Sequence, residues 1–217
     1  MRSSSACARS TATCEAAWPL LVDLHGSGGP PRPEEAYGLD AAPGTADASG
    51  VLLLRPRSRS SDEGGMEVFR WDQNPGDPER NRAFIEALVA DLASRYFVDP
   101  ARLHVMGFSS GTNQTAMARG SATTPFSGYG FVGGGSWTLA AAPDSAARRY
   151  IVTGWRDYMW TYHDALLDLL DAAGVPDAQV FVRETDAGHE LYGWMYPEMW
   201  AFLDHGARPA PGSMASG

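Results

Sequence analysis

Short apolar runs alternate with amphipathic, helix-like segments along this chain, and this alternation restricts the possible folds more than any other feature. The apolar runs are four or five residues long and end in glycine or polar residues, which is typical of buried strands. Strands are expected at 20–24, 51–54, 103–106, 129–132, 150–153 and 179–182, and helices near 77–96, 112–119, 164–173 and 196–203. A chain of this kind builds a mostly parallel sheet with helices on both faces.

The longest helix is predicted from apolar residues that recur every three or four positions, at Phe84, Ile85, Leu88, Val89, Leu92 and Tyr96. Asp77 is its predicted N-cap, because Pro78 would then occupy the first helical position, where its missing N–H costs nothing. Asn81 is the alternative cap. Asp99 and Pro100 end the helix, and the stretch 55–76 before it is expected to be a polar loop.

Parallel sheets bind ligands at the carboxyl ends of their strands, so the residues after each strand are the ones to consider. The strand at 103–106 runs into Gly107-Phe108-Ser109-Ser110-Gly111, a G-x-S-x-G sequence just before a helix. Such a turn lifts a serine hydroxyl above the sheet, and the two glycines leave room for neighbouring backbone. Ser109 is therefore the candidate nucleophile. The alternative is a tight turn that is merely rich in Ser and Gly.

A serine nucleophile needs a histidine base and a carboxylate that orients it. His189 is the candidate base, since it lies in a loop after the last strand, behind Gly188, which would permit close approach. Asp157, after the strand at 150–153, is the candidate acid. Asp186 competes with it, although three residues before His189 it is better placed for an Asx-type turn. The other histidines are in a glycine loop, a strand or helices: His25, His104, His163 and His205.

The glycine-rich loop His25-Gly26-Ser27-Gly28-Gly29 follows the first strand. A tetrahedral oxyanion needs two aimed N–H donors, and the candidates are the N–H of Ser110 together with that of Ser27 or Gly26. The loop could instead bind phosphate. However, it lacks the G-x-G-x-x-G spacing and the P-loop lysine, and the chain contains no Lys at all.

Three blocks carry a family resemblance: Leu24–Gly29 (LHGSGG), Val98–Gly111 (VDPARLHVMGFSSG) and Gly188–Glu190 (GHE). With them the chain resembles the α/β-hydrolases, and among these the serine esterases that include feruloyl esterases, acetylxylan esterases and polyhydroxybutyrate depolymerases. The resemblance spans about residues 19–203 and implies a minimal α/β-hydrolase fold without a lid. It also implies a Ser109–His189–Asp157 triad, an oxyanion hole at His25–Gly28 and Ser110, and neither cofactor nor metal.

Aromatic residues follow several strands, and four residues are expected to bind substrate: His25, Trp137, Trp155 and Trp194. An aromatic cleft suits sugar rings, aryl groups or polyester chains, so the expected substrates are small-molecule, polysaccharide or polyester esters with short or aryl acyl groups. Two alternatives remain open, namely a peptidase on the same fold and a module that binds ligands without catalysis.

Charge and composition limit the partners. The net charge is −9 and would repel a nucleic acid, and no apolar run approaches the roughly 20 residues of a membrane span. One catalytic domain is expected at 18–206, between a flexible segment at 1–17 and a disordered tail at 207–217, and the protein is expected to be a monomer. It would be secreted or periplasmic after signal removal, with the cytoplasm as the alternative. Cys7 and Cys14 either form a disulfide or stay as two thiols.

Overall fold

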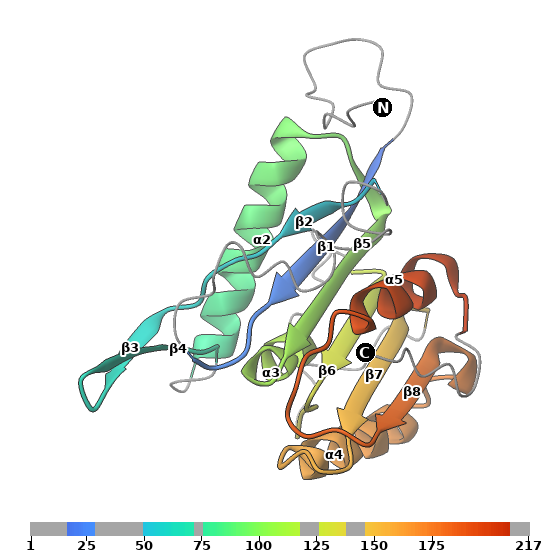
Figure 1. The fold of residues 1–217 in the computed structure, drawn as a ribbon. Helices are drawn as coiled ribbons and strands as arrows, with labels where there is room; N and C mark the ends of the chain where they lie inside the picture. The colour runs from blue at the N-terminus through green and yellow to red at the C-terminus, as the bar shows by residue number, and fades with distance from the viewer. Residues whose placement is uncertain (1–16, 29–49, 72–75, 118–125, 138–145, 209–217) are drawn as a thin grey trace.

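The computed structural model describes residues 17–28, 50–71, 76–117, 126–137 and 146–208. Its centre is a six-stranded sheet in the order β2-β1-β5-β6-β7-β8, in which every neighbouring pair is parallel (Figure 1). The strands are β1 (Trp18–Leu24), β2 (Leu52–Leu54), β5 (Val98–Phe108), β6 (Gly128–Val132), β7 (Arg148–Gly154) and β8 (Val180–Thr185). The parallel sheet predicted from the sequence is confirmed.

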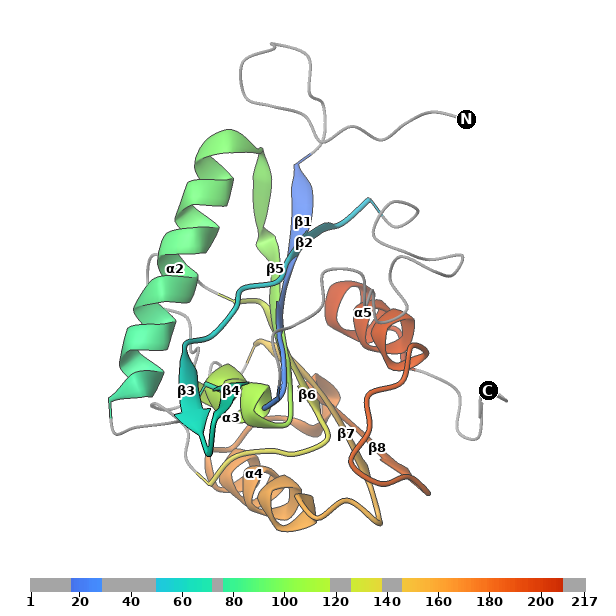
Figure 2. The same ribbon diagram turned by 60° about the vertical axis from the view of Figure 1, so that its left-hand side comes forward.

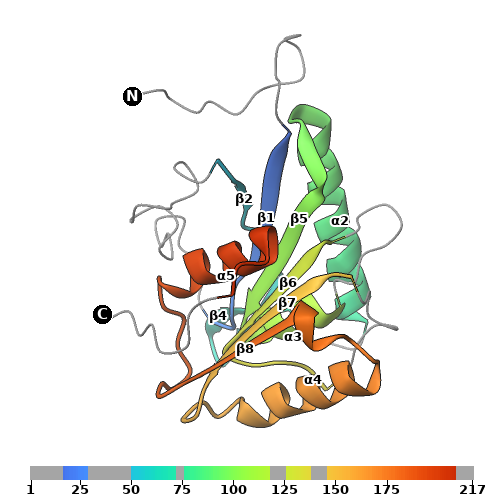
Figure 3. The ribbon, with the colours of Figure 1, turned by 90° about the vertical axis from the view of Figure 1, so that its right-hand side faces the viewer.

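Helices cover both faces of this sheet, as Figures 2 and 3 show. The helices α2 (Asp77–Arg95), α3 (Ser110–Met117) and α4 (Trp160–Ala172) pack on one face, and α5 (Met195–His205) packs on the other. Side chains of β1 alternate between the two layers, since Leu20 and Val22 lie in the first core and Leu21 lies in the second. Because all six strands are parallel, their carboxyl ends lie together at the same end of the sheet, held there by the two cores.

The segment 55–76, predicted to be a polar loop, contains a β-hairpin, so that prediction is wrong. Its strands are β3 (Ser60–Glu63) and β4 (Met66–Phe69), paired antiparallel. Gly64 and Gly65 form the turn with φ of 68° and 85°, which a two-residue turn of this hand requires at both positions. Phe69 also exchanges two backbone hydrogen bonds with Gly28, at 3.1 and 2.7 Å, so the hairpin is tied to the glycine-rich loop.

Several element boundaries differ from prediction. Gly76 with φ of 82° is the N-cap of α2, so Asp77 is its first residue and the predicted Asp77 cap is wrong. The Asn81 side chain donates to the carbonyl of Trp71 instead of capping. Asp99 and Pro100, predicted to lie between helix and strand, belong to β5, while α4 begins at Trp160 and a 3-10 turn (Asp177–Gln179) precedes β8.

Some predictions fall outside the described residues. Cys7, Cys14, Arg119 and nearly all of the two terminal segments lie there. Within the described ranges, no helix combines the length and apolar character that a bilayer crossing requires.

Candidate active site

Ser109 lies on a strained turn between β5 and α3. Its φ is 53°, and among the described residues it is the sole non-glycine residue with a positive φ. Such strain persists only where surrounding contacts enforce it. Here the Ser109 N–H donates to the carbonyl of Val132 at 3.1 Å, and the Thr112 hydroxyl donates to the Ser109 carbonyl at 2.6 Å.

The glycines of the G-x-S-x-G sequence let three pieces of backbone meet. A Cβ at Gly107 would fall on the carbonyl of Gly111, and a Cβ at Gly111 would fall on the carbonyl of Leu24 at the end of β1. The start of α3 therefore packs directly against two strands, which brings Ser109 next to the loop that follows β1. The close approach expected from the motif is present at both positions.

Three side chains predicted from separate parts of the chain meet at this turn. The His189 Nε2 lies 2.8 Å from the Ser109 Oγ, and the His189 Nδ1 lies 2.9 and 3.0 Å from the two carboxylate oxygens of Asp157. An ionised carboxylate only accepts hydrogen bonds, so Nδ1 carries the proton of the neutral ring. Nε2 is then free to accept the proton of the Ser109 hydroxyl, which is the arrangement of a serine nucleophile with its base.

Neighbouring groups fix the orientation of the acid and the base. Asp157 is buried, and it accepts the backbone N–H of Met159 at 2.7 Å. The His189 ring contacts two aromatic rings: it stacks on Phe108 with a centroid distance of 4.9 Å, and its centroid lies 4.4 Å from that of Tyr158. Two aromatic rings therefore pack against the imidazole while its two nitrogens bond to Ser109 and Asp157.

The competing carboxylate and the glycine before His189 have other surroundings. The Asp186 side chain is 80% exposed and pairs with Arg156 at 3.2 Å. A Cβ at Gly188 would meet nothing within 4 Å, so the close approach predicted there is wrong. The crowded glycine is Gly154, where a Cβ would fall on the carbonyl of Ala187.

The backbone N–H groups of two residues beside Ser109 have no acceptor in the described structure. Ser110 is the first residue of α3, where an N–H has no acceptor within the helix. Ser27 and Ser110 both line the cleft that contains Ser109, and within the described ranges neither backbone N–H has a hydrogen-bond acceptor. Gly26 lies close as well, since a Cβ on it would be 3.1 Å from the Ser109 Cβ.

The cleft over Ser109 has a volume of about 420 Å³. One wall comes from the segment after β7 and the start of α4, with Tyr158, Met159 and Tyr162. Another part of the lining comes from the hairpin that the sequence did not predict and the residue after it, with Glu63 and Arg70, whose charged groups are 3.7 Å apart. The remaining lining residues are Ser27, Gly28, Val68, Phe108, Ser109, Ser110, Asn113 and His189.

None of the four residues predicted to bind substrate lines this cleft. Trp137 is 56% exposed and packs on the ring of Tyr162, and Trp155 is 67% exposed. Trp194 packs against the core beneath α5, with Arg183 over its ring, and His25 bonds through both ring nitrogens to backbone. Besides the His189 ring, the aromatic side chains of the cleft are Phe108, Tyr158 and Tyr162. Tyr158 is one of the aromatic residues after strands that the sequence places at this edge, whereas Tyr162 lies within α4 and had no such signal.

A second Ser, His and Asp group has a different character. His104 lies between Ser127 Oγ at 3.2 Å and Asp204 Oδ1 at 3.3 Å, but the Ser127 hydroxyl also donates to the Leu103 carbonyl. His104 is buried, and burial lowers its pKa, so the ring stays neutral inside the core. Ser127 precedes β6, at the edge of the sheet opposite to Ser109. This group joins β5, β6 and α5 and lines no described cavity.

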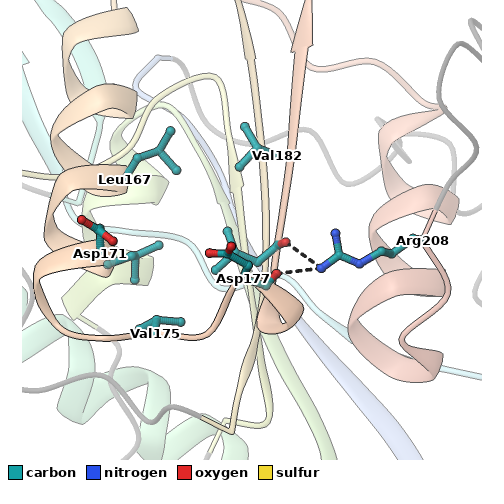
Figure 4. Close-up of a pocket in the computed structure, with 8 residues that line it drawn as sticks. Leu167, Asp171, Val175, Asp177, Val182 and Arg208 are labelled. Carbon is teal, nitrogen blue, oxygen red and sulfur yellow. Dashed lines mark hydrogen bonds between the residues drawn. The ribbon is translucent and has the colours of Figure 1, made fainter.

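A second cavity of about 280 Å³ lies between α4 and the start of β8 (Figure 4). Its lining is mainly apolar, with Leu167, Val175 and Val182, and Arg208 closes it by donating to the carbonyls of Asp177 and Val180. It contains no serine or histidine. In the described part of the chain, no three His, Cys, Asp or Glu side chains come together as metal ligands would.

No protein-family model matches the chain. A curated protein named "Putative esterase NocK", from Nocardia uniformis subsp. tsuyamanensis, is 36% identical over 98 residues. That match covers 43% of this chain and 26% of the relative, so this chain spans about a quarter of that protein.

Solved structures, two of which are described as esterases, share the fold at low sequence identity. Arabidopsis thaliana SOBER1 superposes with a TM-score of 0.64 at 16% identity, covering 87% of this chain and 99% of that chain. The Bacillus cereus carboxylesterase gives 0.60 at 19%, covering 88% and 89%, and esterase PE8 gives 0.64 at 19%, covering 88% and 93%. The chain therefore has the α/β-hydrolase fold that these structures share, a mostly parallel sheet with helices on both faces.

Proposed function

We propose that this protein is a serine carboxylic ester hydrolase that acts on short-chain or aryl esters through Ser109, His189 and Asp157. The observation that carries the proposal is the continuous chain of hydrogen bonds from the Ser109 Oγ through His189 to the Asp157 carboxylate. The partial match to an esterase and the esterases among the structures of like fold support it.

The mechanism follows from the positions of these groups. The Ser109 Oγ attacks the ester carbonyl while the His189 Nε2 takes its proton, and Asp157 stabilises the imidazolium that forms. The N–H groups of Ser110 and Ser27 donate to the oxyanion, a contribution of about 3 kcal/mol for each donor. His189 then protonates the leaving alcohol, and water releases the acyl group from Ser109 by the same steps.

The cleft suits a small ester. A volume of about 420 Å³ is near the lower end of the range for small-molecule sites. Phe108, Tyr158 and Tyr162 give the lining aromatic surface, while Glu63, Arg70 and Asn113 add polar groups. A planar or ring-shaped ester can stack on an aromatic side chain of this lining, whereas the volume is too small to enclose a long acyl chain.

The test is active-site labelling combined with a substrate panel. A fluorophosphonate should add its mass to the peptide that contains Ser109, and p-nitrophenyl acetate and butyrate should be hydrolysed faster than a peptide anilide. Ser109→Ala should lower kcat by several orders of magnitude. Ser94→Ala, on the exposed side of α2, is the matched control and should keep full activity. Hydrolysis by the Ser109 variant, or labelling at another serine, would refute the proposal.

A further inference from the structure

The ring of His25 bonds to backbone through both nitrogens. The Ser58 N–H donates to His25 Nε2 at 3.1 Å, and His25 Nδ1 lies 2.6 Å from the carbonyl oxygen of Gly26. A backbone N–H can only donate, so Nε2 must be unprotonated. The neutral ring therefore carries its proton on Nδ1 and donates it to the Gly26 carbonyl. Burial lowers the pKa of His25, which keeps the ring in this neutral form near pH 7.

This hydrogen bond sets the direction of one peptide plane. The Gly26 carbonyl and the Ser27 N–H belong to the same peptide unit, and in a trans peptide they point in opposite directions. The described chain contains no cis peptide. Because His25 holds the carbonyl oxygen, the Ser27 N–H is directed away from the imidazole. Ser27 lines the cleft over Ser109, and no acceptor for its N–H is present in the described structure.

Other contacts hold the two ends of the loop but leave this peptide alone. The Trp71 indole donates to the His25 carbonyl at 2.9 Å, and Gly28 pairs with Phe69 through two hydrogen bonds. These contacts fix the peptide planes before and after the Gly26–Ser27 unit. Glycine at 26 can rotate easily, so without a partner for its carbonyl this peptide could turn over.

We propose that His25 is a positioning residue, which holds the Gly26–Ser27 peptide so that the Ser27 N–H faces the oxyanion formed at Ser109. This inference rests on the proposed ester hydrolysis. It replaces the expectation that His25 binds substrate. His25 acts on the transition state through Ser27 and does not touch the ester.

Two substitutions at His25 separate this role from an anchoring role. In His25→Asn, the amide nitrogen can occupy the place of Nδ1 and donate to Gly26, but Ser58 loses its acceptor. In His25→Gln, the amide oxygen can reach the place of Nε2 and accept from Ser58, but the Gly26 contact is lost. We expect His25→Gln to lower kcat about 10- to 100-fold with KM within about twofold, since an oxyanion donor acts only in the transition state. His25→Asn should stay within about threefold.

The reverse ranking, or equal losses in both variants, would overturn the inference, because it would mean that the bond to Ser58 or the ring itself matters. His205→Asn, on the exposed end of α5, is the matched control. Fluorophosphonate labelling of Ser109 in the unmodified protein distinguishes failure of the esterase proposal from failure of this one.

A second measurement does not depend on activity. In protein labelled with ¹⁵N-histidine, NMR should show His25 as the neutral tautomer with its proton on Nδ1 at pH 7.5. A proton on Nε2, or a charged ring, would exclude the bond to the Gly26 carbonyl and overturn the inference.

Discussion

Gly107 and Gly111, which flank Ser109, differ from most of the described glycines because backbone atoms fill the space where a side chain would begin. Gly111→Ala would place a methyl group on the Leu24 carbonyl, so β1 and α3 would have to separate. We expect this variant to lose most of its activity. Its free energy of unfolding should fall by about 1–3 kcal/mol, the usual cost of overpacking, so it should unfold at a lower temperature. Gly188→Ala, where a Cβ meets nothing, is the control and should behave as the parent protein in both assays.

The choice between two carboxylates can also be tested at the level of residues. Asp157→Asn should keep the fold but lower kcat about 10³- to 10⁴-fold, because an amide can favour the wrong His189 tautomer. Asp186→Asn should change activity less than twofold, since that carboxylate is exposed and pairs with Arg156. Steady-state kinetics with p-nitrophenyl acetate measure both. A larger loss for Asp186→Asn would show that Asp186, and not Asp157, is the acid that orients His189.

At the scale of elements, α5 is fastened to the sheet by a buried polar group. Arg102 and His104 of β5 both bond to Asp204, and although burial opposes ionisation, these bonds hold the pKa of the Asp204 carboxyl well below its usual range. That contribution to stability is present above about pH 4, the ordinary Asp value, and is lost as the pH falls further. Burial lowers the pKa of His104.

Because the pKa of His104 is lowered in the folded protein, the free energy of unfolding should depend on pH in a direction that can be stated. Below about pH 6.5 the unfolded chain binds a proton at this residue while the folded chain does not, so stability falls as the pH decreases. We expect the unfolding midpoint of the protein to drop between pH 7.5 and 5.5, and His104→Gln to have a smaller drop. Thermal unfolding followed by circular dichroism at both values measures this. An equal drop in the variant would show that other groups cause it.

The elements that the sequence predicted well are those whose apolar side chains build the two cores. The six parallel strands are short apolar runs, and the helices carry apolar residues at helical spacing, so burial and local pattern agree. The hairpin β3–β4 lacks this agreement, because Ser60–Glu63 is polar and both strands, Ser60–Glu63 and Met66–Phe69, are largely exposed. Its available signal was Gly64-Gly65, a two-residue turn sequence between short extended segments.

At the scale of the whole molecule, the sequence predicted the positions of residues that belong to motifs at strand ends. It did not predict the positions of residues that depend on packing alone. Ser109, His189 and Asp157 follow strands whose ends meet at one edge, so their proximity could be expected before the structure was known. Trp194 could not be placed in this way. It lies five residues after His189, but packing under α5 takes it to the second core and away from the cleft.

The size of the cleft predicts the preferred acyl chain. A site of about 420 Å³ with charged groups on one wall can hold an acetyl or butyryl group but cannot enclose a long chain. We expect kcat/KM to be highest for p-nitrophenyl acetate and butyrate and to fall steeply beyond eight carbons. In a site built for lipids, each buried methylene would instead add about 0.8 kcal/mol of binding. A rate that rises toward palmitate would contradict this prediction.

The strand β8 is at the edge of the sheet and pairs only with β7, and His189 is held by the loop that follows it. Edge strands open locally at lower free energy than central ones, so the base can separate from Ser109 while the core stays intact. On heating, hydrolysis should therefore decline several degrees before the circular dichroism signal, and amide hydrogens of 180–185 should exchange faster than those of β5. Simultaneous loss of both signals would argue against this. A substitution that stabilises the edge strand β8 would raise the temperature optimum of hydrolysis without altering the chemistry.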